Sequence, residues 1–300
     1  MAIPEVKSEN IYFYSLDKEE TLYEKDASEE ISIASLTKLM TAIVALEKIE
    51  DLDQTITLTS KDFKGLREQN ASVAGFKIGE EVTYQDLLYG LLLPSGADAA
   101  LALSNHLFGS EESLVKEMNR KVVDWKLKHT HFVNTTGLDI ENHYSSVEDV
   151  ALILKESLKN EEFKKIFTTK KYVTSNKKHT FKSTLLKTSE KNNLDTSYIM
   201  GSKTGYTYAA GLCLASIAEY EGNLYLLVTA NADYKAKKPY HILDANTIYF
   251  YFFNQYEYKT LVYPLLLHLL IFDTPLFYHP FSCCRKAYLP LHIDNLFYYF

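Results

Sequence analysis

The stretch Ser-Leu-Thr-Lys-Leu-Met-Thr-Ala-Ile-Val-Ala-Leu-Glu-Lys-Ile, from Ser35 to Ile49, decides how this chain folds. It contains no Gly or Pro, and apolar residues occupy most of its helical circumference. A helix that is apolar nearly all round belongs in the interior of a domain. We therefore expect this segment to be a central helix against which the rest of the chain packs.

Predicted strands lie on both sides of this helix in the sequence. Residues 10–25 and 211–230 each form a β-hairpin pattern, with turns at Asp17–Glu20 and Glu221–Asn223. Further helices are predicted over residues 84–93, 97–108, 111–127, 146–158 and 240–254. Strands at both ends of a helical middle predict an α/β chain of the α+β type, with helices packed on an antiparallel sheet.

Composition places the chain among soluble globular proteins. It has 300 residues, 46% hydrophobic and 24% charged, with a formal net charge of -7. Nucleic-acid-binding proteins concentrate Lys and Arg on one face, and nothing of that kind is present. The 3 cysteines provide no disulfide framework. The N-terminus lacks the pattern of a signal peptide, which predicts either a cytosolic protein or a chain that begins after a removed signal.

Residues 259–300 have a different composition from the rest. They hold four of the seven prolines, together with Cys283 and Cys284, and show no helix or strand period. Their apolar runs are shorter than the roughly 20 residues that span a bilayer. We expect a catalytic domain over residues 1–258 followed by an atypical tail. The tail is interpreted as an aberrant or frameshifted C-terminus, with a membrane-associated tail as the alternative.

A Ser-x-x-Lys pair can supply a nucleophile and its base. On a helix, residues three apart share a face, and a buried lysine has a lowered pKa and can accept the serine proton. About one such match is expected by chance in 300 residues, and this chain has four, beginning at Ser15, Ser35, Ser113 and Ser175. Only Ser35 starts an apolar helix that would bury its lysine, Lys38.

A second feature is the turn Pro94-Ser95-Gly96 between two apolar helices. It exposes a hydroxyl at a helix junction, where Ser95 has either a chemical role or the simpler role of capping the next helix.

A third feature is the segment Gly201 to Thr207, with the sequence Gly-Ser-Lys-Thr-Gly-Tyr-Thr. Lys203 could attract a substrate carboxylate, and Thr204 and Thr207 could hydrogen-bond to it. Gly205 would let a substrate backbone approach the strand edge. The simpler interpretation is a polar edge strand whose lysine discourages aggregation.

Together, in this order, the three patterns resemble a known motif set. Ser-x-x-Lys, Ser-Gly-x and Lys-Thr-Gly characterise penicillin-binding proteins and class A β-lactamases. Their spacings of 60 and 108 residues resemble those of low-molecular-weight penicillin-binding proteins, the serine-type D-Ala-D-Ala carboxypeptidases of peptidase family S11. Segments 86–92, 132–138 and 143–151 are also similar to that family. The resemblance covers about residues 5 to 258.

This resemblance implies a β-lactamase/transpeptidase-like fold and removal of the terminal D-Ala from peptidoglycan stem pentapeptides. It implies an extracytoplasmic location and covalent inhibition by β-lactams, without a metal or organic cofactor. Ser35 would be the nucleophile, Lys38 its base, and Ser95 with Lys203 a proton relay to the leaving group. The implied substrate-binding residues are Lys203, Thr204, Gly205, Tyr206 and Thr207, with the backbone N–H groups of Ser35 and Tyr206 forming an oxyanion hole.

One residue departs from the family pattern. Ala97 stands where the family usually has Asn, whose amide would contact Lys38 and the substrate. Two alternative functions follow: a β-lactamase of the same fold, and a non-catalytic homologue that binds wall peptide. We expect no Glu-x-x-x-Asn segment of the class A β-lactamase type between the second and third motifs.

Other candidate residues have simpler explanations. His129 and His131 have spacing suited to a metal, but no third ligand is evident, so no metal site is predicted. His143 is expected to make a structural hydrogen bond. Cys213, alternating with apolar residues in a strand, is expected in the core.

Overall fold

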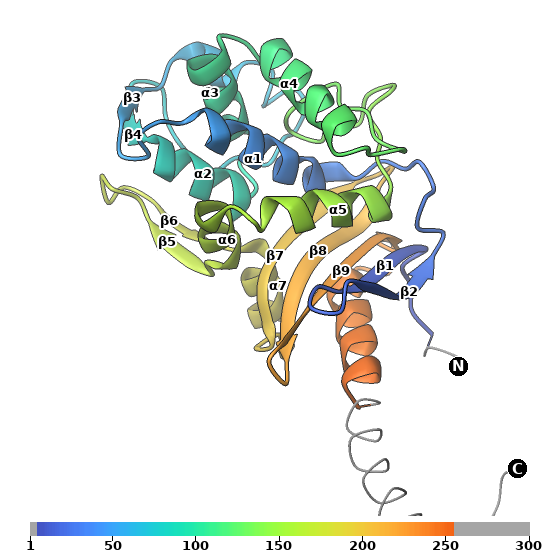
Figure 1. Cartoon of the computed structure of the whole chain (residues 1–300). Coiled ribbons are helices and arrows are strands. Elements are labelled where there is room, and N and C mark those ends of the chain that lie inside the picture. The colour runs from blue at the N-terminus through green and yellow to red at the C-terminus, as the bar shows by residue number, and fades with distance from the viewer. Residues whose placement is uncertain (1–4, 255–300) are drawn as a thin grey trace, which may run out of the picture. The chain divides into compact units, whose positions relative to one another are not determined.

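The two predicted hairpins come together in one antiparallel sheet (Figure 1). The structure is a computed structural model that describes residues 5–254. The sheet has five strands in the order β2-β1-β9-β8-β7. Their bounds are β1 (Asn10–Ser15), β2 (Glu20–Lys25), β7 (Ile199–Thr207), β8 (Gly211–Tyr220) and β9 (Asn223–Ala232). Both hairpins are confirmed, and β1 joins them by pairing with β9, with Phe13 opposite Leu227.

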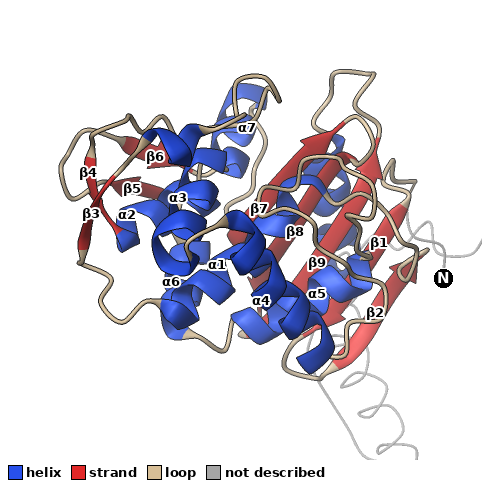
Figure 2. Cartoon of the chain, turned by 90° about the horizontal axis from the view of Figure 1, so that it is seen from above, coloured by secondary structure: helices blue, strands red, loops and turns tan. Residues whose placement is uncertain are grey.

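Helices cover both faces of this sheet (Figure 2). Alternate side chains of β1 point to opposite faces, as strand geometry requires. Tyr12 and Tyr14 line a groove with residues of α5 (Val147–Ser157). Phe13 on the other face packs edge-on against Tyr249 of the helical segment 240–254, with ring centroids 5.5 Å apart. The predicted layer arrangement, an antiparallel sheet between helices, is therefore confirmed.

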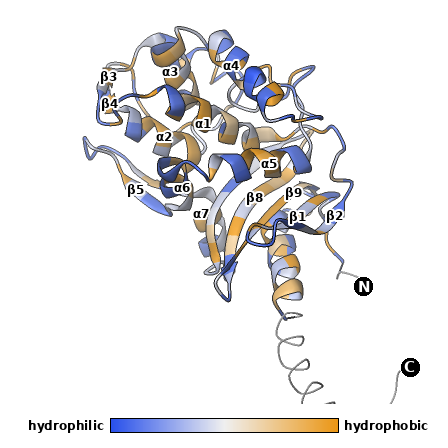
Figure 3. Cartoon of the chain, viewed as in Figure 1, coloured by the Kyte–Doolittle hydropathy of each residue, from blue (hydrophilic) through white to orange (hydrophobic). Residues whose placement is uncertain are grey.

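The apolar segment after Ser35 forms the central helix α1 (Lys38–Lys48). Every residue from Lys38 to Leu46 is buried, and the helix is coloured as largely apolar in Figure 3. Each fully buried aliphatic side chain contributes about 1.5–3 kcal/mol. The helices around it are α2 (Tyr84–Leu92), α3 (Ala97–Phe108), α4 (Glu111–Asp124), α5 and α6 (Glu161–Thr168).

The start of the central helix differs from the prediction. Residues Ala34–Thr37 form a 3₁₀ turn, η1, and the α-helix begins at Lys38. The turn is tightened by a backbone bond from Leu36 to Ile33 and by the Thr37 hydroxyl, which donates to the Ala34 carbonyl at 2.9 Å. Ser35 therefore lies in a tight turn that directly precedes the α-helix.

Four strands have only three residues each, too few to display a period: β3 (Thr55–Thr57), β4 (Glu81–Thr83), β5 (Lys171–Val173) and β6 (Thr180–Lys182). The structure also contains the 3₁₀ turn η2 (Ser60–Phe63) and the helix α7 (Thr184–Asn192), which were not predicted. The helix α6 was also not predicted. The other predicted helices are confirmed, α4 ending at Asp124 rather than at residue 127.

Residues up to Asn254 form one compact unit. The expected boundary near residue 258 and the tail 259–300 lie outside the described residues. Within residues 5–254, no helix has the length and apolarity needed to cross a membrane.

Candidate active site

Ser35 and Lys38 lie together at the start of α1. Lys38 Nζ is 2.9 Å from Ser35 Oγ and donates to the Thr136 carbonyl at 2.6 Å. Lys38 is only 2% exposed. Burial lowers its pKa from 10.5 to about 7, while the negative charge of Asp98 acts in the opposite direction. A substantial fraction of neutral amine is therefore available near pH 7 to accept the Ser35 proton.

The other three Ser-x-x-Lys pairs have different partners. Ser15 Oγ accepts from the backbone N–H of Lys18. Lys116, which follows Ser113, forms an ion pair with Glu112 at 2.8 Å. Ser175 donates to Asp86 at 2.6 Å. Of the four pairs, Ser35 is the one whose hydroxyl is bonded to its own buried lysine amine.

Ser95 and Lys203 form the second pair of the site. Lys203 Nζ donates to Ser95 Oγ at 2.8 Å and to the Thr204 carbonyl at 2.7 Å. Lys203 is fully buried, so its interpretation as a solvent-facing edge lysine is wrong. Burial lowers its pKa well below 10.5, and the positive charge of Lys38 lowers it further. The two lysines therefore share one site in which like charges oppose full protonation of both.

The backbone at Ser95 is held in an uncommon conformation. Its φ is +68°, in the left-handed region, which costs a non-glycine residue about 1–3 kcal/mol. The N-cap of α3 is Gly96, without a side-chain bond, so the interpretation of Ser95 as a helix cap is wrong. A β-carbon at Gly96 would lie 2.6 Å from Asp98 Oδ1. The glycine thus allows the turn that directs the Ser95 hydroxyl towards Lys203.

Asp98 fixes the loop that surrounds this turn. Its Oδ1 accepts from the backbone N–H of Ala74 at 2.7 Å, and its Oδ2 from Gly75 at 3.0 Å and Phe76 at 3.2 Å. Oδ1 also accepts from its neighbour Ala99. The carboxylate is 1% exposed. It therefore anchors residues 74–76 and leaves a negative charge near Lys38.

The edge strand β7 lies against the η1 turn that carries Ser35, and Figure 2 shows β7 at one edge of the sheet. A β-carbon at Gly205 would lie 3.1 Å from the backbone nitrogen of Ser35 and 3.2 Å from the Ile33 carbonyl oxygen. The glycine therefore permits close contact between β7 and the η1 turn. Because β7 pairs only with β8 within residues 5–254, alternate backbone groups of its outer edge have no strand partner in this part of the chain. Tyr206, which follows Gly205, is 47% exposed.

The two threonines have different environments. Thr204 Oγ1 is 2.5 Å from Thr184 Oγ1, at the first turn of α7. Thr207 donates to Asp139 at 2.8 Å and accepts from the backbone N–H of Ala210 at 3.0 Å. The Thr204 hydroxyl thus has only another hydroxyl as partner, whereas the Thr207 proton is already engaged by a carboxylate.

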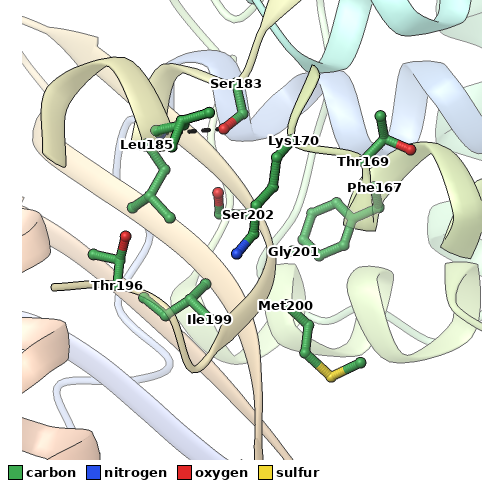
Figure 4. A pocket seen from close by; sticks show the side chains of 11 residues that line it. Phe167, Thr169, Lys170, Ser183, Leu185, Thr196, Ile199, Met200, Gly201 and Ser202 are labelled. Carbon is green, nitrogen blue, oxygen red and sulfur yellow. Dashed lines mark hydrogen bonds between the residues drawn. The ribbon is translucent and has the colours of Figure 1, made fainter. Parts of the chain in front are cut away.

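A cleft of about 790 Å³ adjoins Tyr206 and Thr136, within the range of small-molecule sites. A second pocket lies beside β7 between α6 and α7, lined by Phe167, Lys170 and Ser202 (Figure 4). Its volume of about 20 Å³ is room for about one water molecule. The larger cleft is therefore the candidate substrate site.

The remaining predictions concern residues outside the two pairs. His143 makes the expected structural bonds: Nδ1 accepts from the backbone N–H of Val133 at 3.0 Å, so Nε2 donates to Thr37 at 2.9 Å. Cys213 is fully buried, as expected. Ala97 is buried against Leu66 and Leu101 and contributes only a methyl group.

The residues that suggested a metal site or a β-lactamase make structural contacts in this fold. Within residues 5–254, no group of three potential metal-binding side chains is found, and His131 Nδ1 bonds to the Asn142 carbonyl. A Glu-x-x-x-Asn sequence does occur, at Glu156 to Asn160, contrary to expectation. Glu156 pairs with Lys159, and Asn160 caps α6.

Sequence reasoning missed three groups that the fold brings to the site. The Thr136 carbonyl holds Lys38, Thr184 lies against Thr204, and Asp139 accepts from Thr207. These partners are 98, 20 and 68 residues away in sequence. No local pattern marks them; only the similarity of segment 132–138 to the family pointed to this region.

A serine bonded to a buried lysine amine, at the start of a helix packed on an antiparallel sheet, is the arrangement of the β-lactamase/transpeptidase-like class of serine enzymes. This chain has that fold. The family model described as D-alanyl-D-alanine carboxypeptidase matches residues 1–234. The chain therefore belongs to that family, peptidase family S11.

Relatives and solved structures agree with this assignment. The chain is 37% identical over 215 residues to the D-alanyl-D-alanine carboxypeptidase DacF of Bacillus subtilis, covering 69% of this chain but 53% of DacF. It thus spans about half the length of that relative. It is 33% identical to the D-alanyl-D-alanine carboxypeptidase of Streptomyces sp. K15, covering 67% of this chain and 73% of that protein. The crystal structure of the Streptomyces K15 DD-transpeptidase superposes with a TM-score of 0.74 at 29% identity, covering 84% of this chain and 98% of that one.

Proposed function

We propose that this chain is a serine-type D-alanyl-D-alanine carboxypeptidase that removes the terminal D-Ala from peptidoglycan stem pentapeptides. The observation that carries the proposal is the 2.9 Å contact between Lys38 Nζ and Ser35 Oγ in a buried environment that lowers the lysine pKa to about 7. Membership of the carboxypeptidase family supports the choice of substrate. An extracytoplasmic location follows from that substrate, because peptidoglycan lies outside the membrane.

During acylation the Ser35 proton moves to Lys38, a bond forms from Ser35 Oγ to the substrate carbonyl carbon, and the C–N bond of the substrate breaks. The neutral Lys38 amine accepts the Ser35 hydroxyl proton as Oγ attacks the carbonyl carbon between the two D-alanines. The N–H groups of Ser35 and Tyr206 stabilise the oxyanion, and a donor of this kind is typically worth about 3–4 kcal/mol. The C–N bond then breaks, leaving an ester on Ser35.

The second pair, Ser95 and Lys203, would protonate the amine of the leaving D-Ala. The departing D-Ala amine takes the Ser95 hydroxyl proton, which Lys203 replaces across their 2.8 Å contact. The substrate carboxylate, held by Lys203, Thr204 and Thr207 over Gly205, favours the protonated form of Lys203. Because the Thr207 proton is engaged by Asp139, Thr204 is the better placed of the two threonines.

Deacylation uses the same base. After D-Ala leaves, Lys38 loses to water the proton that it took from Ser35, and Lys203 regains from water the proton that it gave to Ser95. Water then attacks the ester carbon as the neutral Lys38 amine accepts its proton, and the acyl–oxygen bond breaks. Ser35 Oγ recovers a proton from Lys38, which returns the enzyme to its starting state. No step needs a group outside the described residues apart from water.

The test compares three proteins in two assays. The unmodified chain, Ser35→Ala and Ser113→Ala are incubated with a fluorescent penicillin and with a synthetic stem pentapeptide. Ser113 is a matched control because it also begins a Ser-x-x-Lys sequence. We expect covalent labelling and D-Ala release from the unmodified chain and Ser113→Ala, and neither from Ser35→Ala.

Other outcomes separate the alternatives. Labelling that persists in Ser35→Ala excludes Ser35 as the nucleophile. Rapid penicillin turnover without stable labelling indicates a β-lactamase. Binding of the pentapeptide without D-Ala release indicates a non-catalytic homologue. In that case Ala97, which stands where the family usually has Asn, is the first position to test as the cause of the lost activity.

A further inference from the structure

The 790 Å³ cleft lies on one side of the nucleophile. Thr136, which holds Lys38, and Tyr206, which follows Gly205, are both in its lining. Thr207, whose hydroxyl already donates to Asp139, lines the cleft, whereas Ser95, Lys203 and Thr204 do not. If these three serve the leaving D-alanine, as proposed above, the cleft receives the acyl side of the substrate.

One wall of this cleft is aromatic. Tyr206 and Tyr208 line it, and Tyr234 packs against both, with ring centroids 5.4–6.0 Å apart. Tyr208 is 79% exposed, so the ring is not part of the core. The faces of such rings attract cations, most strongly where part of the hydration shell is removed.

A carboxylate lies beside this aromatic wall. Asp139 lines the cleft and accepts through Oδ1 from Thr207, the residue between the two tyrosines in sequence. Glu111 lines the same cleft and accepts from the Thr135 hydroxyl at 2.8 Å. The only cation among the lining residues is Lys64. The lining is therefore net negative, which is complementary to an ammonium group.

We propose that this cleft is a subsite for an ammonium-bearing side chain on the substrate, with Asp139 and the ring of Tyr208 as its recognition groups. The inference rests on the proposed function. In a stem peptide, the residue before the acyl D-alanine is a diamino acid with a side-chain amine. The α-carbon of that residue lies one trans peptide, about 3.8 Å, before the α-carbon of the acyl D-alanine, so its side chain belongs to the acyl side of the substrate. Asp139 and Tyr208 are specificity-determining residues rather than catalytic ones.

The test uses two pentapeptides that differ only at this amine, one with lysine before the acyl D-alanine and one with Nε-acetyl-lysine. For the unmodified chain we expect kcat/KM for D-Ala release to be about threefold to tenfold higher with lysine, as exposed ion pairs and cation–π contacts allow. Asp139→Asn, which keeps an acceptor for Thr207, and Tyr208→Ala should each reduce that preference towards one. In each variant, acylation by penicillin, which lacks the amine, should change by the same factor as kcat/KM for the Nε-acetyl-lysine peptide.

The matched control is Glu141→Gln, which neutralises an exposed carboxylate two positions away that does not line the cleft. It should keep the full preference. Equal rates on both peptides by the unmodified chain, or equal loss of preference in Asp139→Asn and Glu141→Gln, overturns the inference. Absence of D-Ala release from either peptide is a different result, because it contradicts the proposed function itself.

Discussion

A β-carbon added to Gly137 would lie 1.9 Å from the carbonyl oxygen of Ala34. Gly137 has a φ of +81° and Ala34 a φ of +46°, so two backbone segments in left-handed conformations meet at the residue before Ser35. The Ala34 oxygen also accepts from Thr37, which in turn is bonded to His143. The position of Ser35 therefore depends on a glycine about 100 residues away in sequence.

Gly137→Ala should remove acylation by penicillin and lower the free energy of unfolding by more than about 3 kcal/mol, because backbone atoms must move to admit the methyl group. The measurements are penicillin labelling and denaturant unfolding. Gly79→Ala is the matched control: Gly79 has a φ of +80° with nothing within 4 Å of its added β-carbon. Gly79→Ala should lower the free energy of unfolding by only about 1 kcal/mol, the cost of placing a β-carbon in the left-handed region. Similar losses in the two variants would contradict the steric explanation.

The pH dependence of acylation should follow Lys38. In the proposed function the base is the neutral Lys38 amine, and burial lowers the pKa of Lys38 to about 7. The rate constant for penicillin acylation should therefore rise with pH, about tenfold per unit well below pH 7, and level off above it. Stopped-flow fluorescence from pH 5 to 9 measures this profile. The variant Lys116→Met, which alters the lysine of an exposed Ser-x-x-Lys pair, should have the same midpoint. A rate that is flat or falling between pH 5 and 7 is incompatible with Lys38 as the base.

Asp98→Asn should destabilise the loop that carries Ala74, Gly75 and Phe76. An amide nitrogen would face backbone N–H donors in place of one carboxylate oxygen, and hydrogen bonds to a charged acceptor are worth about 1.5–3 kcal/mol. We expect a lower free energy of unfolding and faster hydrogen exchange at these three amides. Asp51→Asn, at an exposed turn where Oδ1 accepts from Asp53, should change neither quantity by more than about 0.5 kcal/mol. Unchanged exchange at residues 74–76 would show that the loop is held by other contacts.

His143 should make stability depend on pH between about 4 and 6.5. Burial lowers its pKa to about 4. As pH falls through 6.5 the unfolded chain binds a proton there before the folded protein does, so the free energy of unfolding falls. The stability advantage of the unmodified chain over His143→Gln should therefore shrink by on the order of 3 kcal/mol between pH 7 and pH 4. Denaturant unfolding across this range measures it. His129→Gln, at a partly exposed histidine, should show the same pH dependence of the free energy of unfolding as the unmodified chain. If His143→Gln also shows that same pH dependence, His143 is not the group responsible for it.

The sequence by itself determined the scaffold. The apolar period after Ser35 predicted the central helix, and the two turn-flanked β-rich segments predicted hairpins that pair in one sheet, because burial of an apolar face specifies helix and strand locally. The order of Ser35, Ser95 and Lys203 gave the family and its motif residues. Strands such as β5 and β6 were not predicted because three residues are too few to display a period. The helices α6 and α7 were not predicted either, although the capping side chains of Asn160 and Ser183 mark their starts locally.

Only the tertiary structure decided which of these groups act together. The apolar helix after Ser35 distinguished it from the other three Ser-x-x-Lys pairs, but only the fold shows that Lys38 is 2% exposed beside its serine and that burial lowers its pKa to about 7. The bonds that complete the site, from Lys203 to Ser95 and from Thr207 to Asp139, join segments 108 and 68 residues apart. Local sequence cannot encode such distances or the removal of water, which is why Asp139 and the cleft it lines emerged only from the folded chain.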